Sequence, residues 1–131
     1  MSHFRKRRSS NSLFQTPYHQ MPGNEYAVFS EIPVSVRDKW IPILVLHYNE
    51  SHRHYHTLNH IHYMLHQLEQ ISPIVNLSDQ QLKILQFAIW FHDVIYTIPS
   101  PMGENEVNSV LAFQHYAQDA NLVFLLSVKL T

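Results

Sequence analysis

The stretch SHRHYHTLNHIHYML, residues 51–65, joins a turn to the start of an amphipathic helix and carries the strongest functional signal in the chain. It holds five of the eleven histidines, at positions 52, 54, 56, 60 and 62. Imidazole is the commonest metal-binding side chain, and it binds through a neutral ring nitrogen. A metal site is therefore the leading hypothesis. The alternative is a histidine-rich surface exposed to solvent, which needs no metal.

The helix within this stretch is predicted to cover residues 57–71, with its first residue as the N-cap. Its apolar side chains recur at helical spacing, at Leu58, Ile61, Leu65 and Leu68. His56 and His60 are four residues apart, as are His62 and His66. Residues four apart share a helix face, so each pair is placed to converge on a ligand. For His62 and His66, plain exposure to solvent is the favoured interpretation.

An earlier helix is predicted between residues 34 and 50. Its apolar positions follow a spacing of three and four, at Val36, Trp40, Ile43, Leu44 and Tyr48. Pro42 interrupts this pattern. The helix is therefore expected either to begin near Pro42 or to kink there.

A domain boundary is predicted at residue 33. Residues 1–33 contain the basic run RKRR at 5–8, a serine-rich run after it and no helical periodicity, so they are expected to form a disordered tail. A nuclear address or a contact with a polyanion is the alternative. Residues 34–131 are expected to form one helical domain, because the chain length suits a single core. Strand signals are weak and hairpin dipeptides are absent, so the predicted class is all-α.

A second histidine signal ends the next predicted helix, residues 79–95. Ser78 and Gln81 have the capping-box pattern at its start. Its second half is apolar almost all round, so burial is expected. The Asp93 carboxylate then requires a partner, because an unpaired buried charge is costly. That partner is a metal or a protonated histidine. Alternatively, Asp93 caps a neighbouring element and His92 is a hydrogen-bonded core residue.

A further helix is predicted from residue 104 to about residue 118, after a loop rich in proline. Glu106 lies in its first turn, where a carboxylate suits the positive helix end, so spacing alone disfavours a role in a site. A break is expected at residues 119–121. Leucines at 122, 125, 126 and 130 predict the start of a fifth helix.

Composition excludes several functional classes. Apolar residues make up 45% and charged residues 15%, as in globular domains. A net charge of −1 argues against specific nucleic-acid binding, and the apolar runs are too short to span a membrane. The absence of cysteine removes thiolate ligands and nucleophiles and fits an intracellular protein, with the cytoplasm as the expected location.

Three motifs together resemble the predicted metal-dependent HD-domain phosphohydrolases, in a subgroup that is uncharacterised. They are HRHYHTLNHIHYML, AIWFHDVIY at residues 88–96 and ENEVNS at residues 104–109, and residues 40–48 before them belong to the same resemblance. A histidine–aspartate doublet alone is a weak signal, whereas its WFHD form between the other two motifs is specific. The resemblance covers about residues 40–113. It implies an HD-like bundle of α-helices whose metal ligands are a histidine, an adjacent histidine–aspartate pair and a later aspartate.

Transferred to this sequence, the resemblance implies that His60, His92 and Asp93 are metal ligands. Neighbouring residues of a helix point about 100° apart, so His92 and Asp93 reach one ion only near a helix end or bend. The cation is left open among Mn, Fe, Mg, Ni and Zn. His56 matches a position next to the site, where it is expected either to orient the surroundings of His60 or to contact a substrate phosphate. Asn105 matches a position that supports the ligands.

The resemblance also implies catalytic roles for Asp93, Arg53 and Glu106. The fork of the Arg53 guanidinium suits phosphate oxygens. Glu106 follows Asn105 in the N-E pair and is expected to assist proton transfer. The implied reaction is hydrolysis of a small phosphoester or nucleotide by a hydroxide formed on the cation.

One departure from the family pattern is the last aspartate ligand, which has no counterpart. Asp119 lies in the predicted break rather than in a later helix. The helical domain is therefore expected to be incomplete at its C-terminal end, with weaker metal binding. The alternative function is an inactive HD remnant that binds a metal or nucleotide, or that serves as a protein-interaction module. A third hypothesis is a nonspecific metal-binding surface that includes His62 and His66.

Overall fold

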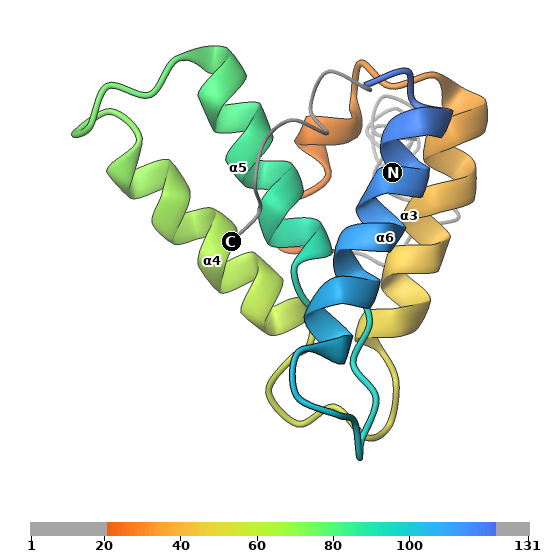
Figure 1. Ribbon diagram of the computed structural model, residues 1–131. Helices are drawn as coiled ribbons and strands as arrows, with labels where there is room; N and C mark the ends of the chain where they lie inside the picture. Colours follow the sequence, from red (N-terminus) through yellow and green to blue (C-terminus); the bar gives the residue numbers. More distant parts are fainter. Residues whose placement is uncertain (1–20, 123–131) are drawn as a thin grey trace, which may run out of the picture.

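The computed structural model describes residues 21–122 as a set of α-helices preceded by one short 3-10 helix (Figure 1). The elements are η1 (Ala27–Phe29), α3 (Val34–Tyr48), α4 (Leu58–Ile71), α5 (Asp79–Phe91) and α6 (Glu104–Asp119). The four α-helices are accompanied by no strand within this described part, which confirms the all-α class. None of these helices is long and apolar enough to cross a membrane. The basic run and the predicted fifth helix beyond Leu122 lie outside the described residues.

Helix α3 begins directly after Pro33, so a start near Pro42 is wrong. Pro33 is the N-cap, with ψ at 141°, and Pro42 lies inside the helix. An interior proline costs about 3 kcal/mol. Four large side chains of α3 are buried, at Trp40, Ile41, Leu44 and Tyr48. At about 1.5–3 kcal/mol for each fully buried side chain, their burial outweighs that cost.

The start of α5 is confirmed, whereas its end comes earlier than predicted. The Ser78 hydroxyl accepts a hydrogen bond from the Gln81 N–H at 3.1 Å, and the Gln81 side chain accepts one from the Ser78 N–H at 2.9 Å. The helix ends at Phe91 rather than at residue 95, with His92 as its C-cap. His92 and Asp93 therefore lie at a helix end, the position that would allow both side chains to reach the same ion.

Residues 21–33 belong to the core, so the predicted tail is wrong for this segment. Tyr26 is 1% exposed and Phe29 is 0% exposed. The Tyr26 ring stacks on Trp90 at 5.4 Å, and the Phe29 ring meets the edge of Phe87 at 5.7 Å. The Trp90 indole N–H also donates to the Glu25 carbonyl at 3.0 Å. Aromatic contacts, rather than helical periodicity, hold this segment in place.

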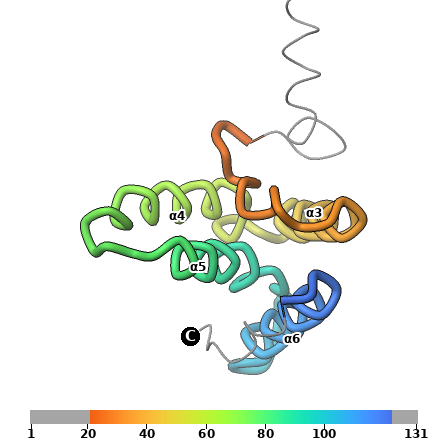
Figure 2. The backbone as a smooth tube through the Cα atoms, turned by 90° about the horizontal axis from the view of Figure 1, so that it is seen from above, coloured from red at the N-terminus to blue at the C-terminus, as the bar shows by residue number. Residues whose placement is uncertain are grey.

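Figure 2 shows α5 between α4 and α6, with residues 21–33 entering on the side of α3 and α4. An aromatic cluster joins α5, α6 and α3. Phe91 lies 5.3 Å from Phe113 and 5.0 Å from Tyr116, and Tyr116 lies 5.7 Å from Trp40, measured between ring centroids. The ends of α4 and α5 near residues 58 and 91 therefore rest on a packed core.

Asp119 ties the end of α6 to α3. One of its carboxylate oxygens accepts hydrogen bonds from the Lys39 ammonium at 2.7 Å and from the Trp40 indole at 2.8 Å. The last aspartate of the described chain thus serves to join two helices.

The Asp119 contacts give stability a pH dependence. The hydrogen bond from Lys39, and then that from Trp40, hold the pKa of Asp119 below 3.8, the ordinary value of an aspartate carboxyl. A lowered carboxyl pKa stabilises the fold above 3.8, and this contribution is lost as the pH falls through the folded pKa. We expect Asp119→Asn to lower Tm at about pH 6, and we expect this difference from the unsubstituted chain to shrink as the pH falls below 3.8.

Thermal unfolding monitored by circular dichroism measures this difference at each pH. The control is Glu69→Gln, because the Glu69 carboxylate is exposed and has no cationic partner in residues 21–122. A Tm difference for Asp119→Asn that stays constant from about pH 6 to about pH 2 would contradict the expectation.

Candidate functional site

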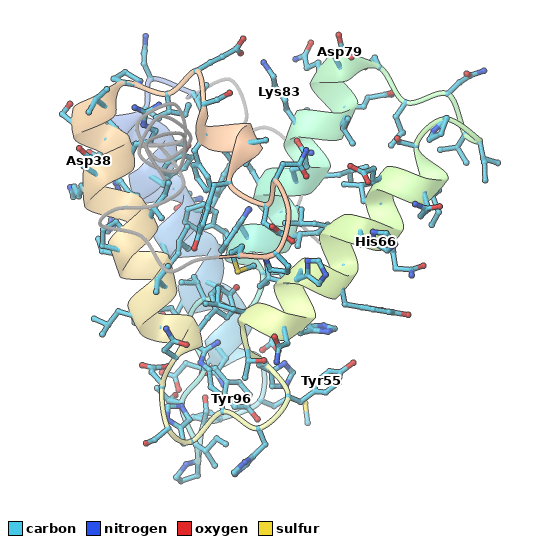
Figure 3. All side chains as sticks on the ribbon, turned by 180° about the vertical axis from the view of Figure 1, so that it is seen from behind. Asp38, Tyr55, His66, Asp79, Lys83 and Tyr96 are labelled. Atoms are coloured by element: carbon cyan, nitrogen blue, oxygen red, sulfur yellow. The ribbon has the colours of Figure 1, made fainter. Side chains whose placement is uncertain are left out.

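The predicted site residues gather where α4 begins and α5 ends. His56 precedes α4, and His60 lies in its first turn. His92 and Asp93 follow the last residue of α5. Tyr55 and Tyr96, labelled in Figure 3, mark this end of the molecule. The Tyr96 ring is 4.5 Å from that of His56, and the Tyr55 ring is 4.6 Å from that of His60.

The Asp93 carboxylate lies between two imidazoles. One of its oxygens is 2.9 Å from His56 Nδ1 and 3.0 Å from His92 Nε2. The other ring nitrogen of His92 donates to the Ile89 carbonyl at 2.7 Å. His92 therefore has a hydrogen-bond acceptor at each ring nitrogen, an arrangement that suits the protonated imidazolium.

Electrostatics strengthen the pairing of His92 with Asp93. Partial burial alone lowers the pKa of His92, but its hydrogen bonds to Asp93 and to the Ile89 carbonyl raise this pKa overall. Burial alone raises the pKa of Asp93, but the hydrogen bond and charge of His92, with help from His56, lower it overall. The two residues therefore favour an ion pair of imidazolium and carboxylate.

The pKa of His60 is lowered, in contrast to that of His92, which favours the neutral imidazole at position 60. Burial lowers its pKa first, and the charge of His92 lowers it further. Its ring centroid lies 6.2 Å from that of His92 and 6.5 Å from that of His56. Within residues 21–122 it makes no hydrogen bond, so its ring nitrogens are available to a ligand.

Three imidazoles and a carboxylate are chemically suited to a divalent cation. As the side chains lie, however, no three histidine or acidic groups among the described residues are placed to hold one ion. Asp93 pairs with His56 and His92, and it forms no ion pair with His60. The structure thus places His60, His92 and Asp93 close together. Their ring nitrogens and carboxylate oxygens are not arranged so that all three residues could contact one ion.

Arg53 takes a position different from the predicted phosphate contact. Its side chain is 0% exposed. The guanidinium donates to three main-chain carbonyls, those of His56 at 3.0 Å, Asp93 at 2.8 Å and Val94 at 2.7 Å. It also pairs with the Glu50 carboxylate at 3.0 Å. The predicted phosphate contact is therefore not open to a ligand, and Arg53 instead clamps the turn before α4 to the end of α5.

Two tyrosines, which the sequence did not single out as site residues, enclose this clamp. The Arg53 guanidinium lies 4.9 Å from the Tyr48 ring and 5.5 Å from the Tyr96 ring. The Tyr48 hydroxyl donates to the Trp90 carbonyl at 2.7 Å. Their positions in the chain offered one signal, since Tyr48 ends α3 and Tyr96 lies three residues after Asp93.

The N-E-x-x-S motif fixes the loop that follows Asp93. The Asn105 side-chain oxygen accepts from the Thr97 N–H at 3.2 Å, and its amide donates to the Thr97 carbonyl at 3.1 Å. The buried Ser109 hydroxyl accepts from the Ile95 N–H at 3.1 Å. Asn105 therefore acts on the loop rather than directly on the imidazoles. Glu106 is exposed and makes no hydrogen bond or ion pair with residues 21–122, so no contact brings it to Asp93.

No family model, curated protein or solved structure matches this chain.

Proposed function

We propose that this chain is a phosphohydrolase of the HD-domain type, acting on a small phosphoester or nucleotide with a divalent cation. The observation that carries the proposal is the Asp93 carboxylate held between His56 and His92, with the neutral His60 beside them. These groups come from two separate parts of the chain, as the resemblance to HD domains requires.

A cavity beside His60 provides room for a substrate. Its volume is about 390 Å³, and it is lined by His54, Tyr55, Thr57, Asn59, His60 and Tyr63. Small-molecule sites have volumes of roughly 300–1,000 Å³. The aromatic rings of Tyr55 and Tyr63 suit stacking against a nucleobase, and the neutral His60 is placed to receive a proton or to bind a cation.

Cation binding at this cluster requires a rearrangement. His92 and Asp93 neutralise each other, so a cation that used both would have to break their contact. The absence of a formed three-ligand set within residues 21–122 favours a second candidate function, a non-catalytic module that binds a nucleotide or a protein. The two candidates differ in whether turnover depends on Asp93 and on added metal.

The test uses the full chain purified without a histidine tag. We expect manganese to support hydrolysis of a generic phosphodiester or of a nucleotide, and Asp93→Asn and His60→Ala to lower the rate by about 100-fold. The matched control is His62→Ala, a histidine of the same helix that lines a different cavity. Circular dichroism confirms that each variant is folded, and metal analysis after dialysis reports the bound cation.

Two results would contradict the hydrolase proposal. Equal loss of metal in the His62→Ala and His60→Ala proteins would indicate a nonspecific histidine surface. No turnover with any cation, together with nucleotide binding that survives Asp93→Asn, would favour the non-catalytic module.

A further inference from the structure

An apolar groove lies between α4 and α5 and reaches the proposed site. It has a volume of about 270 Å³ and is lined by Met64, Leu68, Leu85, Ala88, Ile89 and His92. All of these side chains except His92 are apolar, and each retains some exposure to solvent, with Leu85 40% exposed. Such a surface is suited to ligand binding, because covering it removes apolar area from water.

On α5, the groove follows one face of the helix. Leu85, Ile89 and His92 are separated by four and three residues, so their side chains share this face. Phe91 lies about 100–160° away from them around the helix and packs on Phe113 of α6. The groove face of α5 is therefore turned away from the side that contacts α6, and it ends at His92 of the proposed site.

On α4, the facing side chains lead to another histidine of the site. Met64 and Leu68, which line the groove, continue a spacing of four residues that begins at His60. The centroids of the His60 and His92 rings lie 6.2 Å apart. Figure 1 shows that residues 72–78 join α4 and α5 at the end opposite these histidines. The groove thus runs along the helix pair and ends at the two imidazoles.

The lining of the groove selects the chemistry of its ligand. Among the described residues that line it, only His92 carries a strong hydrogen-bonding group, so the polar edges of a nucleobase would lack partners there. From Leu85 to His92 the helix advances about 10 Å. An extended chain advances about 1.2 Å per bond, so an unbranched hydrocarbon of about eight carbons has the matching length.

From this groove and the two histidines at its end, we propose that the substrate is the phosphate ester of an apolar alcohol. Its phosphate lies beside His60 and His92, and its hydrocarbon chain lies between α4 and α5. This inference rests on the hydrolase activity proposed above and narrows its substrate to one class of phosphoester. In the reaction, the oxygen of water joins phosphorus, the ester bond from phosphorus to the alcohol oxygen breaks, and that oxygen takes one proton of the water.

Binding measured without metal tests the placement of the hydrocarbon chain. Isothermal titration calorimetry compares butyl phosphate with octyl phosphate on the full chain, at concentrations below those at which octyl phosphate forms micelles. Full burial of one methylene strengthens binding about fourfold, so we expect octyl phosphate to bind at least about tenfold more tightly than butyl phosphate.

A substitution in the groove locates the hydrocarbon chain. Leu85→Gln places an amide at the open edge of the groove, at a side chain that is 40% exposed, so we expect the fold to tolerate it. The ratio of the two affinities should fall by at least about threefold. The matched control is Leu111→Gln on α6, at a leucine that is 46% exposed and lies outside the groove, and it should keep the full ratio. Circular dichroism confirms that both variants are folded.

Hydrolysis of the same esters separates this inference from the proposed function. A higher kcat/KM for octyl phosphate than for butyl phosphate, with added manganese, supports both. Turnover with equal kcat/KM for the two esters would overturn the inference and leave the hydrolase proposal standing. Length-dependent binding that Leu85→Gln weakens, without turnover with any cation, would support the groove as the site of the apolar group and contradict the hydrolase proposal.

Three binding results would overturn the inference. The first is an affinity that does not depend on chain length. The second is a length dependence that Leu85→Gln leaves unchanged. The third is a dimer, detected by size-exclusion chromatography, that excludes octyl phosphate and that Leu85→Gln abolishes, which would assign the groove to a second copy of the chain.

Discussion

The Phe29→Ala variant is expected to lose about 3–5 kcal/mol of the free energy of unfolding, the usual cost of removing a buried phenylalanine ring. Phe29 is 0% exposed, and its ring meets those of Phe87, Trp90 and Tyr116 at 5.7–5.9 Å. The segment before α3 thus contributes to the same core as α5 and α6. Urea denaturation followed by tryptophan fluorescence measures the change.

The matched control for this variant is Val34→Ala, five residues later and 57% exposed. Surface substitutions of this kind change stability by no more than about 0.5 kcal/mol. If both variants had the same small effect, residues 21–33 would not be part of the cooperative core, and the tail predicted from the sequence would be reinstated for this segment.

The Arg53→Met variant is expected to cost about 3–5 kcal/mol, the range seen when one partner of a buried charged network is removed. The substitution leaves the carbonyls of Asp93 and Val94 without their guanidinium donors, and the Glu50 carboxylate keeps only His47 and His52 nearby. Arg53→Lys should recover little, because one ammonium cannot reproduce a fork that binds several carbonyls. Urea denaturation gives the stability of each variant, and hydrogen exchange reports loosening at residues 93–97.

Arg37→Lys is the control for Arg53→Lys. Arg37 uses one guanidinium nitrogen to reach the Ser30 carbonyl at 3.3 Å, in an exposed setting, so we expect a change within about 0.5 kcal/mol. Equal stability of the Arg53→Lys and Arg37→Lys proteins would show that the guanidinium fork is not what holds the turn to α5.

The helices could be predicted where local chemistry fixes them. The capping box of Ser78 and Gln81 marks the start of α5, and the leucine spacing marks α4. The segment around η1 escaped prediction because its aromatic side chains reach the core from a turn of only three residues, which has no periodicity to detect. Pro42 led to a wrong helix start for the opposite reason. A proline disfavours the interior of a helix, but burial of the side chains around Pro42 outweighed that local cost.

The site was predictable as a neighbourhood but not as a set of contacts. The motif spacing identified His56, His60, His92 and Asp93, and the structure brings them together. Which imidazole pairs with the carboxylate depends on the turn at residues 49–57 and on the point at which α5 ends. Both are tertiary features: the buried Arg53 connects segments 40 residues apart in the chain.

The Arg53 clamp separates the motion of the Asp93 side chain from that of its backbone. The guanidinium grips the carbonyls of Asp93 and Val94, whereas the carboxylate points to the histidines. A change of partner at the carboxylate then needs only rotation about the side-chain bonds of Asp93, because Arg53 holds the backbone of this residue in place. Such rotations are faster by orders of magnitude than local unfolding. A change of partner at this carboxylate therefore does not require the end of α5 to move.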